Sequence, residues 1–237
     1  MPDTLIQAIV LASLAGLAIP AGAALAMIER LLPDWHEVEL RHGIVAFGAG
    51  ALLSAVALVL IPEGSAKLPA WTALASFALG GLAFFAVDVA LARRGGQAAQ
   101  FLAMMLDYVP EAMALGAVLA DQAETALLLA LMIGLQNLPE GFNAFREMAG
   151  GSVRRWRLLG LFALMVPLGP LAAAGGHVFL ADMPRVLGFG MMFSAGGILY
   201  LMFQDLAPQV RLERHWGPPL GAIAGFSLGL AGHMALH

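Results

Sequence analysis

The stretch that decides the fold is Leu5 to Ile28, LIQAIVLASLAGLAIPAGAALAMI, which contains no charged residue. About 20 apolar residues are enough for an α-helix to cross the hydrocarbon core of a bilayer. The stretch is too long for the hydrophobic region of a signal peptide, and no basic residue precedes it. We therefore expect it to be a retained first transmembrane helix.

The composition extends this prediction to the whole chain of 237 residues. Hydrophobic residues make up 60% and charged residues 12% of the sequence, and the mean hydropathy is +0.84. Soluble domains carry about 25% charged residues, and a soluble fold of this size could not bury so much apolar surface. We predict an all-α integral membrane protein with one domain, residues 1–237. The lack of cysteine excludes disulfides, thiolate zinc sites and cysteine nucleophiles.

Hydropathy predicts eight spans in total, each near the ~20 residues needed to cross a bilayer. The expected spans are 4–28, 43–65, 71–92, 99–121, 124–147, 158–181, 185–208 and 217–237.

The basic residues give an independent prediction of topology. If the connections are numbered along the chain, the odd ones lie on one side of the membrane and carry ten of the twelve basic residues. Lys67 and Arg185 are on the other side. By the positive-inside rule the odd side is cytoplasmic, so both termini are expected to be extracytoplasmic. The ten are Arg30, Arg41, Arg93, Arg94, Arg146, Arg154, Arg155, Arg157, Arg211 and Arg214.

The fourth and fifth spans contain two copies of one polar motif. The fourth reads LDYVPEA (106–112) and the fifth reads LQNLPEG (135–141), so a polar residue is followed three positions later by Pro-Glu in both. The copies are 29 residues apart, and each lies near the middle of its span. An ionisable side chain at the bilayer centre costs about 2.5–3.5 kcal/mol, so a repeated pair predicts a functional site.

Helical spacing brings the polar side chains of the motif together. Asp107 and Glu111 are four residues apart and share a helix face, as do Gln136 and Glu140. The short turn near Ala120–Thr125 makes the two helices antiparallel neighbours. Four oxygen-bearing side chains are therefore expected to converge in the middle of the membrane.

Three carboxyl groups at one place would repel each other if all were ionised. Neither span contains a Lys or Arg before Arg146, so protons, a bound cation or both must offset the repulsion. Pro110 and Pro139 each remove one helical N–H, which frees a carbonyl beside the polar face. We favour a divalent-cation site. The alternative is a pair of proline-kinked helices that hold neutral, hydrogen-bonded acids.

Four further residues within the spans are weaker candidates. Glu63, Asp88 and Asp205 lie near the ends of theirs and are predicted to be interfacial or structural instead of primary ligands. His177 is expected to be packed instead of bound to metal, and a role in the ion pathway is left open.

The two motifs resemble those of the ZIP family of divalent metal-ion transporters, which carries His-Asn-x-Pro-Glu-Gly in its fourth span and a related Pro-Glu-Gly segment in its fifth. LIPE (60–63) and LYLMFQDLAP (199–208) are similar to the ends of the family's second and seventh spans. The resemblance covers nearly the whole chain. It implies eight spans with both termini outside, and transport of zinc, iron, manganese or cadmium into the cytoplasm. It also implies that helices one, four, five and six move against the other four.

The chain departs from the family pattern at four positions that bear on the metal ligands. Asp107 stands in place of the family histidine and Tyr108 in place of the following asparagine. Asn137 stands where many members have an acid or a histidine, and Val166 stands where a glutamate often precedes Pro167. Most ligands of the family's second metal site are thus missing, and the resemblance implies a single site.

The expected metal ligands are Asp107, Glu111, Gln136 and Glu140, with Asn137 as a neutral oxygen donor. Oxygen-only ligand sets suit hard cations such as manganese, whereas imidazole favours zinc. We therefore expect a weaker zinc preference than in a relative that carries the histidine.

Two other functions compete with transport. A transport-inactive metal-binding or sensor protein would explain the missing second-site ligands. An intramembrane metalloenzyme is disfavoured because no His-Glu-x-x-His motif is present, so we expect no enzyme activity. The expected partners are membrane lipid and divalent metal ions, with no organic cofactor and no nucleic acid. A homodimer is left open, and the expected location is a bacterial-type inner membrane.

Overall fold

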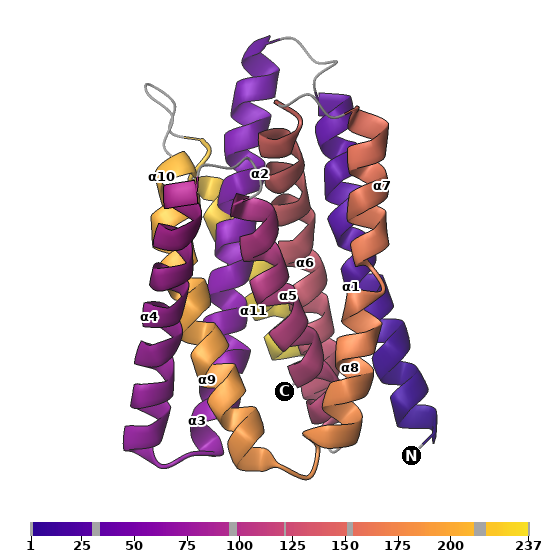
Figure 1. Ribbon diagram of the computed structural model, residues 1–237, viewed down its shortest axis with the longest axis vertical. Helices are drawn as coiled ribbons and strands as arrows, with labels where there is room; N and C mark the ends of the chain where they lie inside the picture. Colours follow the sequence, from indigo (N-terminus) through magenta and orange to yellow (C-terminus); the bar gives the residue numbers. More distant parts are fainter. Residues whose placement is uncertain are drawn as a thin grey trace.

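The computed structural model describes residues 2–29, 34–94, 99–120, 122–150, 154–210 and 217–236. These residues form a bundle of long helices, and no strand occurs in the described ranges (Figure 1). The all-α prediction is confirmed. Six helical segments are long and apolar enough to cross a membrane: Asp3–Ile28, Arg41–Ala66, Ala70–Ala90, Ala123–Met148, Arg155–Phe179 and Pro184–Val210.

Every expected span coincides with helix in the structure. The elements that match single spans are α1 (Pro2–Glu29), α4 (Ala70–Arg94), α5 (Ala99–Val118), α6 (Ala123–Met148) and α11 (Leu220–Leu236). Two of these, the acid-bearing α5 and the shorter α11, are not among the six segments that meet the spanning criterion. The number eight therefore stays a prediction.

The other three expected spans are interrupted helices. The second is α2 (Asp34–Ala55), the π-helical turn η1 (Val56–Leu60) and α3 (Ile61–Ala66). The sixth is α7 (Arg155–Met165) and α8 (Leu168–Phe179). The seventh is α9 (Pro184–Leu201), the π-helical turn η2 (Met202–Leu206) and α10 (Ala207–Val210).

The interruptions do not fall where the repeated motif suggests. Helices α5 and α6 continue through Pro110 and Pro139, although each proline lacks the amide hydrogen that a regular helix uses. The backbone changes instead at Pro167, between α7 and α8, and at η1 and η2. In η2 the amide of Ala207 bonds Met202 O, a π-type bond of the kind often found at functional sites.

Glycines allow several helix pairs to approach closely. An added Cβ on Gly116 of α5 would lie 1.9 Å from Ala173 O of α8, and one on Gly196 of α9 would lie 1.9 Å from Phe77 O of α4. Such contacts between small residues and a facing backbone are typical of helices packed in membranes.

The packing divides the helices into two groups. In the first helix group, α1 packs on α6 and α5 packs on α8, with α7 against α1. In the second, α2 packs on α11 and α4 packs on α9, with α3 and α10 beside them. The groups meet where α2 contacts α6 and α5 contacts α9.

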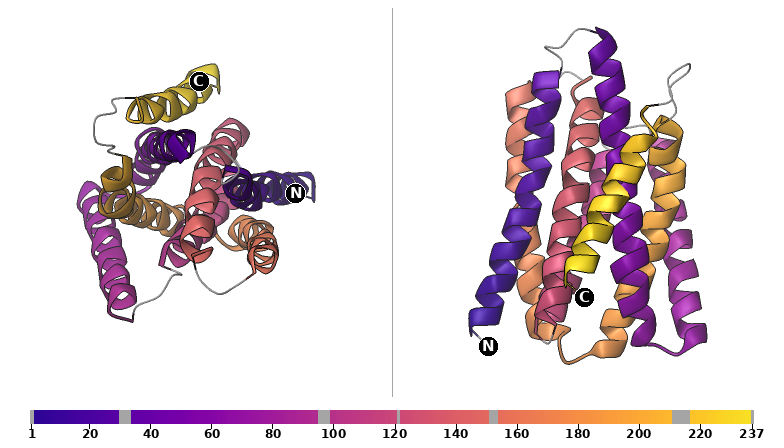
Figure 2. Two further views of the ribbon diagram at one scale, coloured as in Figure 1. Left: turned by 90° about the horizontal axis from the view of Figure 1, so that it is seen from above. Right: turned by 180° about the vertical axis from the view of Figure 1, so that it is seen from behind.

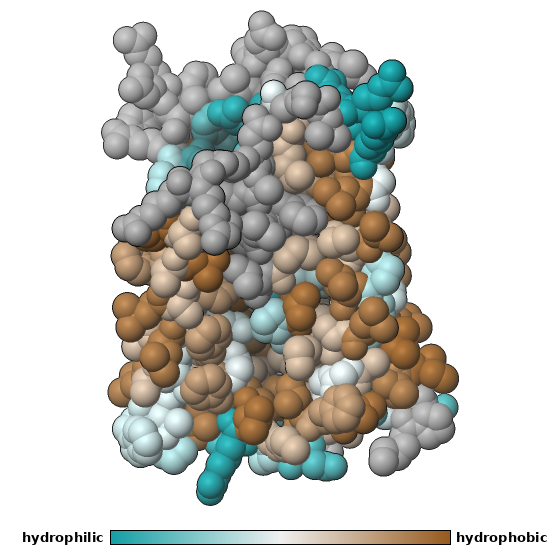
Figure 3. Space-filling model, in the orientation of Figure 1, coloured by the Kyte–Doolittle hydropathy of each residue, from teal (hydrophilic) through white to brown (hydrophobic). Residues whose placement is uncertain are grey.

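The surface has the polarity pattern of a membrane protein. Apolar side chains cover the middle of the face in Figure 3, and hydrophilic ones gather toward its ends. Exposed apolar residues include Trp71, Leu171 and Ile223. Both termini lie toward the lower part of the bundle in Figures 1 and 2, the end where α3 joins α4 and α8 joins α9. Among the basic residues of the predicted topology, Arg30, Arg211 and Arg214 lie outside the described residues.

Candidate metal-ion site

The two copies of the motif are in direct contact. The side-chain amide of Gln136 on α6 donates a hydrogen bond to Glu111 Oε2 on α5, and both side chains are buried. The antiparallel packing of α5 on α6 that the short turn predicts produces this contact. The other carboxylate oxygen of Glu111 and the amide oxygen of Gln136 are buried without a hydrogen-bond partner.

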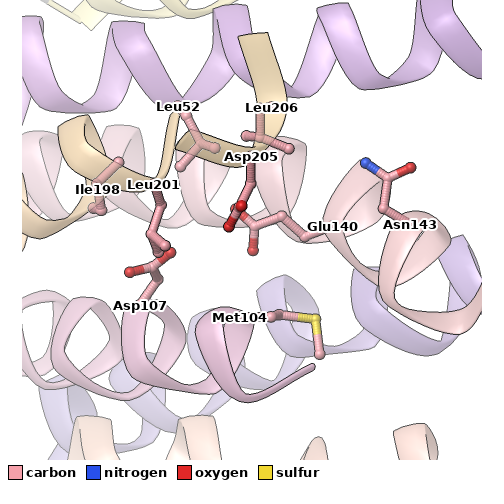
Figure 4. A pocket seen from close by; sticks show the side chains of 9 residues that line it. All are labelled: Leu52, Met104, Asp107, Glu140, Asn143, Ile198, Leu201, Asp205 and Leu206. Carbon is pink, nitrogen blue, oxygen red and sulfur yellow. The ribbon is translucent and has the colours of Figure 1, made fainter. Parts of the chain in front are cut away.

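Three acids line one cavity beside this pair. Asp107 of α5, Glu140 of α6 and Asp205 of η2 reach it from different helices (Figure 4). The cavity is about 40 Å³, enough for a water or an ion, since one water needs about 10–15 Å³ on this measure. The rest of its lining is Leu52, Met104, Asn143, Ile198, Leu201 and Leu206.

The oxygens of the motif acids around this cavity lack donors. Asp107 Oδ1 and both carboxylate oxygens of Glu140 are buried and have no hydrogen-bond partner. An unsatisfied buried polar atom costs about 1–3 kcal/mol, and more when it is charged. No Lys or Arg is among the residues that line the cavity. A site rich in unpartnered acceptors and lacking basic side chains fits a cation or protons.

The acids surround the cavity instead of meeting at a point. Within the described ranges, no group of three or more His, Asp or Glu side chains is close enough to hold a metal ion as the structure stands. A bound cation would have to complete its shell with amide oxygens or water, or draw the carboxylates inward. Hard cations such as Mg²⁺ commonly keep several waters when bound.

Asp205 and Asn143 line the cavity, although neither was predicted to be a primary ligand. The sequence predicts Asp205 to be interfacial or structural, yet it faces the same cavity as Asp107 and Glu140. Asn143 is buried and lies three residues after Glu140, on the same side of α6. The three-residue spacing from Glu140 could have predicted Asn143 as a lining residue. The signal for Asp205 was weaker, because it consisted only of an acid inside an apolar span.

Asn137, expected as a fifth oxygen donor, has its amide turned elsewhere. Its Nδ2 donates to Ala15 O on α1 at 3.1 Å, and its Oδ1 is buried without a partner. Asn137 is not among the residues that line the cavity. Only its Oδ1 could therefore act as a ligand, and it would do so from outside the cavity.

Asp88, Glu63 and His177, the other weaker candidates, have partners of their own. Asp88 Oδ2 accepts a hydrogen bond of 2.8 Å from the Tyr200 hydroxyl, between α4 and α9. Glu63 forms an ion pair with Lys67, four residues later, with 2.7 Å between Oε2 and Nζ. His177 has Nδ1 3.0 Å from Gly116 O, so it packs against α5 away from the cavity.

Comparisons with family models and with curated proteins found no relative. A scan against protein-family models found no match, and a search of curated proteins found none either. The function of the chain has to be inferred from its own residues and their geometry.

Proposed function

We propose that the protein transports a divalent metal cation across a membrane through a single site formed by Asp107, Glu111, Gln136 and Glu140. One observation carries the proposal. These four residues bury five oxygen atoms without hydrogen-bond partners, and no basic residue lines the adjoining cavity. Intramembrane acids are costly and usually mark ion pathways, and a cation that draws the carboxylates inward would give these oxygens the partner they lack.

The proposal includes membership of the ZIP family, which rests on the resemblance of the two Pro-Glu motifs and of the second and seventh spans. Eight spans, extracytoplasmic termini and inward transport of zinc, iron, manganese or cadmium are parts of the same proposal. Agreement between the expected spans and the helices supports the count. The separation of basic residues between odd and even connections supports the orientation.

The position of the cavity supports transport over static binding. Asp107 and Glu140 belong to the first helix group, whereas Asp205, Leu52 and Ile198 belong to the second. A cavity lined by both groups changes shape when one group moves against the other, as the family resemblance implies. Rigid movement of one helix bundle past another around a midplane site is a common route to alternating access.

Flux into proteoliposomes tests the proposal. Purified protein is reconstituted with a metal-sensitive dye inside, and Mn²⁺, Zn²⁺, Fe²⁺ and Cd²⁺ are added outside. We expect saturable entry of at least one ion above the rate in empty vesicles. The matched control is the Glu111→Gln/Glu140→Gln variant, which keeps side-chain volume but removes both charges. Absence of flux for every ion, under gradients of either direction, would refute transport.

A membrane metal sensor is the second candidate, and it is favoured by the Tyr108 and Val166 departures. It differs from a transporter in one measurable respect. A sensor binds metal saturably in equilibrium dialysis but gives no flux in the same proteoliposomes.

A further inference from the structure

We propose that Tyr108 and Asn137 are positioning residues that tether both copies of the site motif to α1. They occupy equivalent places in the repeat, because each lies two residues before the proline and three before the glutamate. Each makes a hydrogen bond to a backbone carbonyl of the same helix, α1. The inference rests on the proposed function, since it concerns how the cation ligands are held.

The tethers act on the turns of α5 and α6 that contain a proline. Pro110 and Pro139 each remove one backbone hydrogen bond from the turn that carries a site acid. Hydrogen bonds from outside the helix can replace the lost constraint. Tyr108 supplies one for the turn of Glu111, and Asn137 supplies one for the turn of Glu140.

The Tyr108 side chain lies in a socket in which two backbone carbonyls and two glycines surround its hydroxyl. The residue is fully buried, and its hydroxyl lies 3.2 Å from Ala12 O and 3.4 Å from Val166 O. A Cβ on Gly16 would lie 2.1 Å from the hydroxyl oxygen, and one on Gly169 only 1.7 Å from it. Two glycines therefore make room for the phenol between α1, α5 and the α7–α8 junction.

The two acceptors make α1 a common support. Ala12 and Ala15 are three residues apart, so their positions lie on one face of α1. Asn137 donates to Ala15 O at 3.1 Å from a fully buried position. Helix α1 packs along α6 and also contacts α5. Through these bonds it fixes the turns of Glu111 and Glu140 relative to each other.

Metal affinity measures this role, whereas overall stability does not. Ligands held in place lose less conformational freedom when they bind an ion, so a loosened turn should raise the Kd. Mn²⁺ and Zn²⁺ titrations of the unaltered chain and of Tyr108→Phe in nanodiscs give that Kd. We expect Tyr108→Phe to bind about fivefold more weakly, the effect of one lost hydrogen bond. Ser76→Ala on α4, which removes another buried hydroxyl, is the matched control and should leave the Kd unchanged.

A double-mutant cycle tests the socket itself. In Gly16→Ala the new methyl displaces the hydroxyl, so this variant should also bind more weakly. In Gly16→Ala/Tyr108→Phe the nearest ring atom is Cζ at 3.1 Å, so the methyl fits with a small adjustment. We expect the double variant to bind like Tyr108→Phe alone. Additive losses would contradict a shared tether.

Asn137→Asp distinguishes a tether from a ligand by whether the Kd for metal rises or falls. Titrations of this variant are made at a pH at which infrared difference spectroscopy against the unaltered chain shows the new carboxyl group ionised, because burial favours its neutral form. A carboxylate cannot donate to Ala15 O, so the tether account expects weaker metal binding. A residue that binds the ion through oxygen would instead bind it more tightly as a carboxylate. Tighter binding by Asn137→Asp, or an unchanged Kd in Tyr108→Phe, would overturn the tether alone. Failure of the unaltered chain to bind any ion would overturn the proposed function as well.

Discussion

The hydrogen bond from Gln136 to Glu111 makes the two copies of the motif unequal. It joins α6 to α5 and engages one carboxylate oxygen of Glu111. Glu140, the corresponding acid of the second copy, has both carboxylate oxygens buried without a partner. The first glutamate is thus oriented before a cation arrives, and the second has both oxygens available for it.

Both glutamates should be indispensable for flux. Glu111→Ala and Glu140→Ala each remove a buried carboxylate from the proposed site, so we expect metal-dependent flux to disappear in proteoliposomes while the protein still inserts into the membrane. The control is Glu124→Ala, at an exposed position in the first turn of α6. Normal flux in Glu140→Ala would remove α6 from the site.

Asp205 should contribute to metal affinity from the second helix group. It lines the same cavity as Asp107 and Glu140, so Asp205→Asn removes one charge that would stabilise a bound cation. A lost hydrogen bond or ion contact to a charged group costs about 1.5–3 kcal/mol, so we expect the Kd to rise roughly 10- to 100-fold. Asp182→Asn, on the exposed α8–α9 connection, should leave the Kd unchanged. Equal effects of the two variants would mean that Asp205 does not contact the ion.

Asp107 should set the balance between zinc and manganese. The side chain supplies oxygen where a histidine would supply nitrogen, and imidazole ligands favour zinc over manganese. In Asp107→His the ratio of zinc to manganese affinity should therefore rise, as measured by titration with both ions. An unchanged ratio would show that residue 107 does not determine selectivity.

One metal ion should bind at this depth. The Tyr108 hydroxyl contacts Val166 O, and Tyr108 and Val166 stand where the family resemblance would put ligands of a second site. Neither side chain offers a carboxylate. Metal analysis after dialysis should give one ion per chain, and a structure with two bridged ions between α5 and α6 would contradict this.

Two glycine substitutions should differ in their effect on stability. In Gly116→Ala the new Cβ would lie 1.9 Å from Ala173 O, so α5 and α8 must separate; overpacking of this kind costs about 1–3 kcal/mol. Gly160 has nothing within 4 Å of the corresponding position, and alanine is the better helix former by up to about 1 kcal/mol. Thermal unfolding in detergent should place Gly116→Ala below the unaltered protein and Gly160→Ala level with it or above.

Much of the fold could be predicted because bilayer thickness and helix geometry act on local sequence. Each span expected from hydropathy falls on helix in the described residues. The four-residue spacing within each motif and the short turn predicted that the polar side chains would converge, and Gln136 and Glu111 are in contact. The π-helical turns were not predicted, because they depend on how a helix packs as well as on its prolines. The prolines of the motif itself left α5 and α6 continuous.

The composition of the cavity could be predicted only in part, because it depends on how separate helices are aligned. Hydropathy estimates the depth of Asp205 along its own helix, but tertiary packing decides that η2 and α6 line the same cavity. The direction of the Asn137 side chain could be inferred from its position in the motif. It follows Gln136 by one residue, about 100° around the helix, and so points toward another neighbour, α1.

The division into two helix groups has a practical consequence for spectroscopy. The chain contains no cysteine, so a spin label can be attached at a single introduced thiol without first removing native ones. Gly160 on α7 and Gly190 on α9 are exposed, have open space at the Cβ position, and belong to different groups. A pair of labels at these glycines would convert movement between the groups into a distance distribution that can be recorded with and without metal.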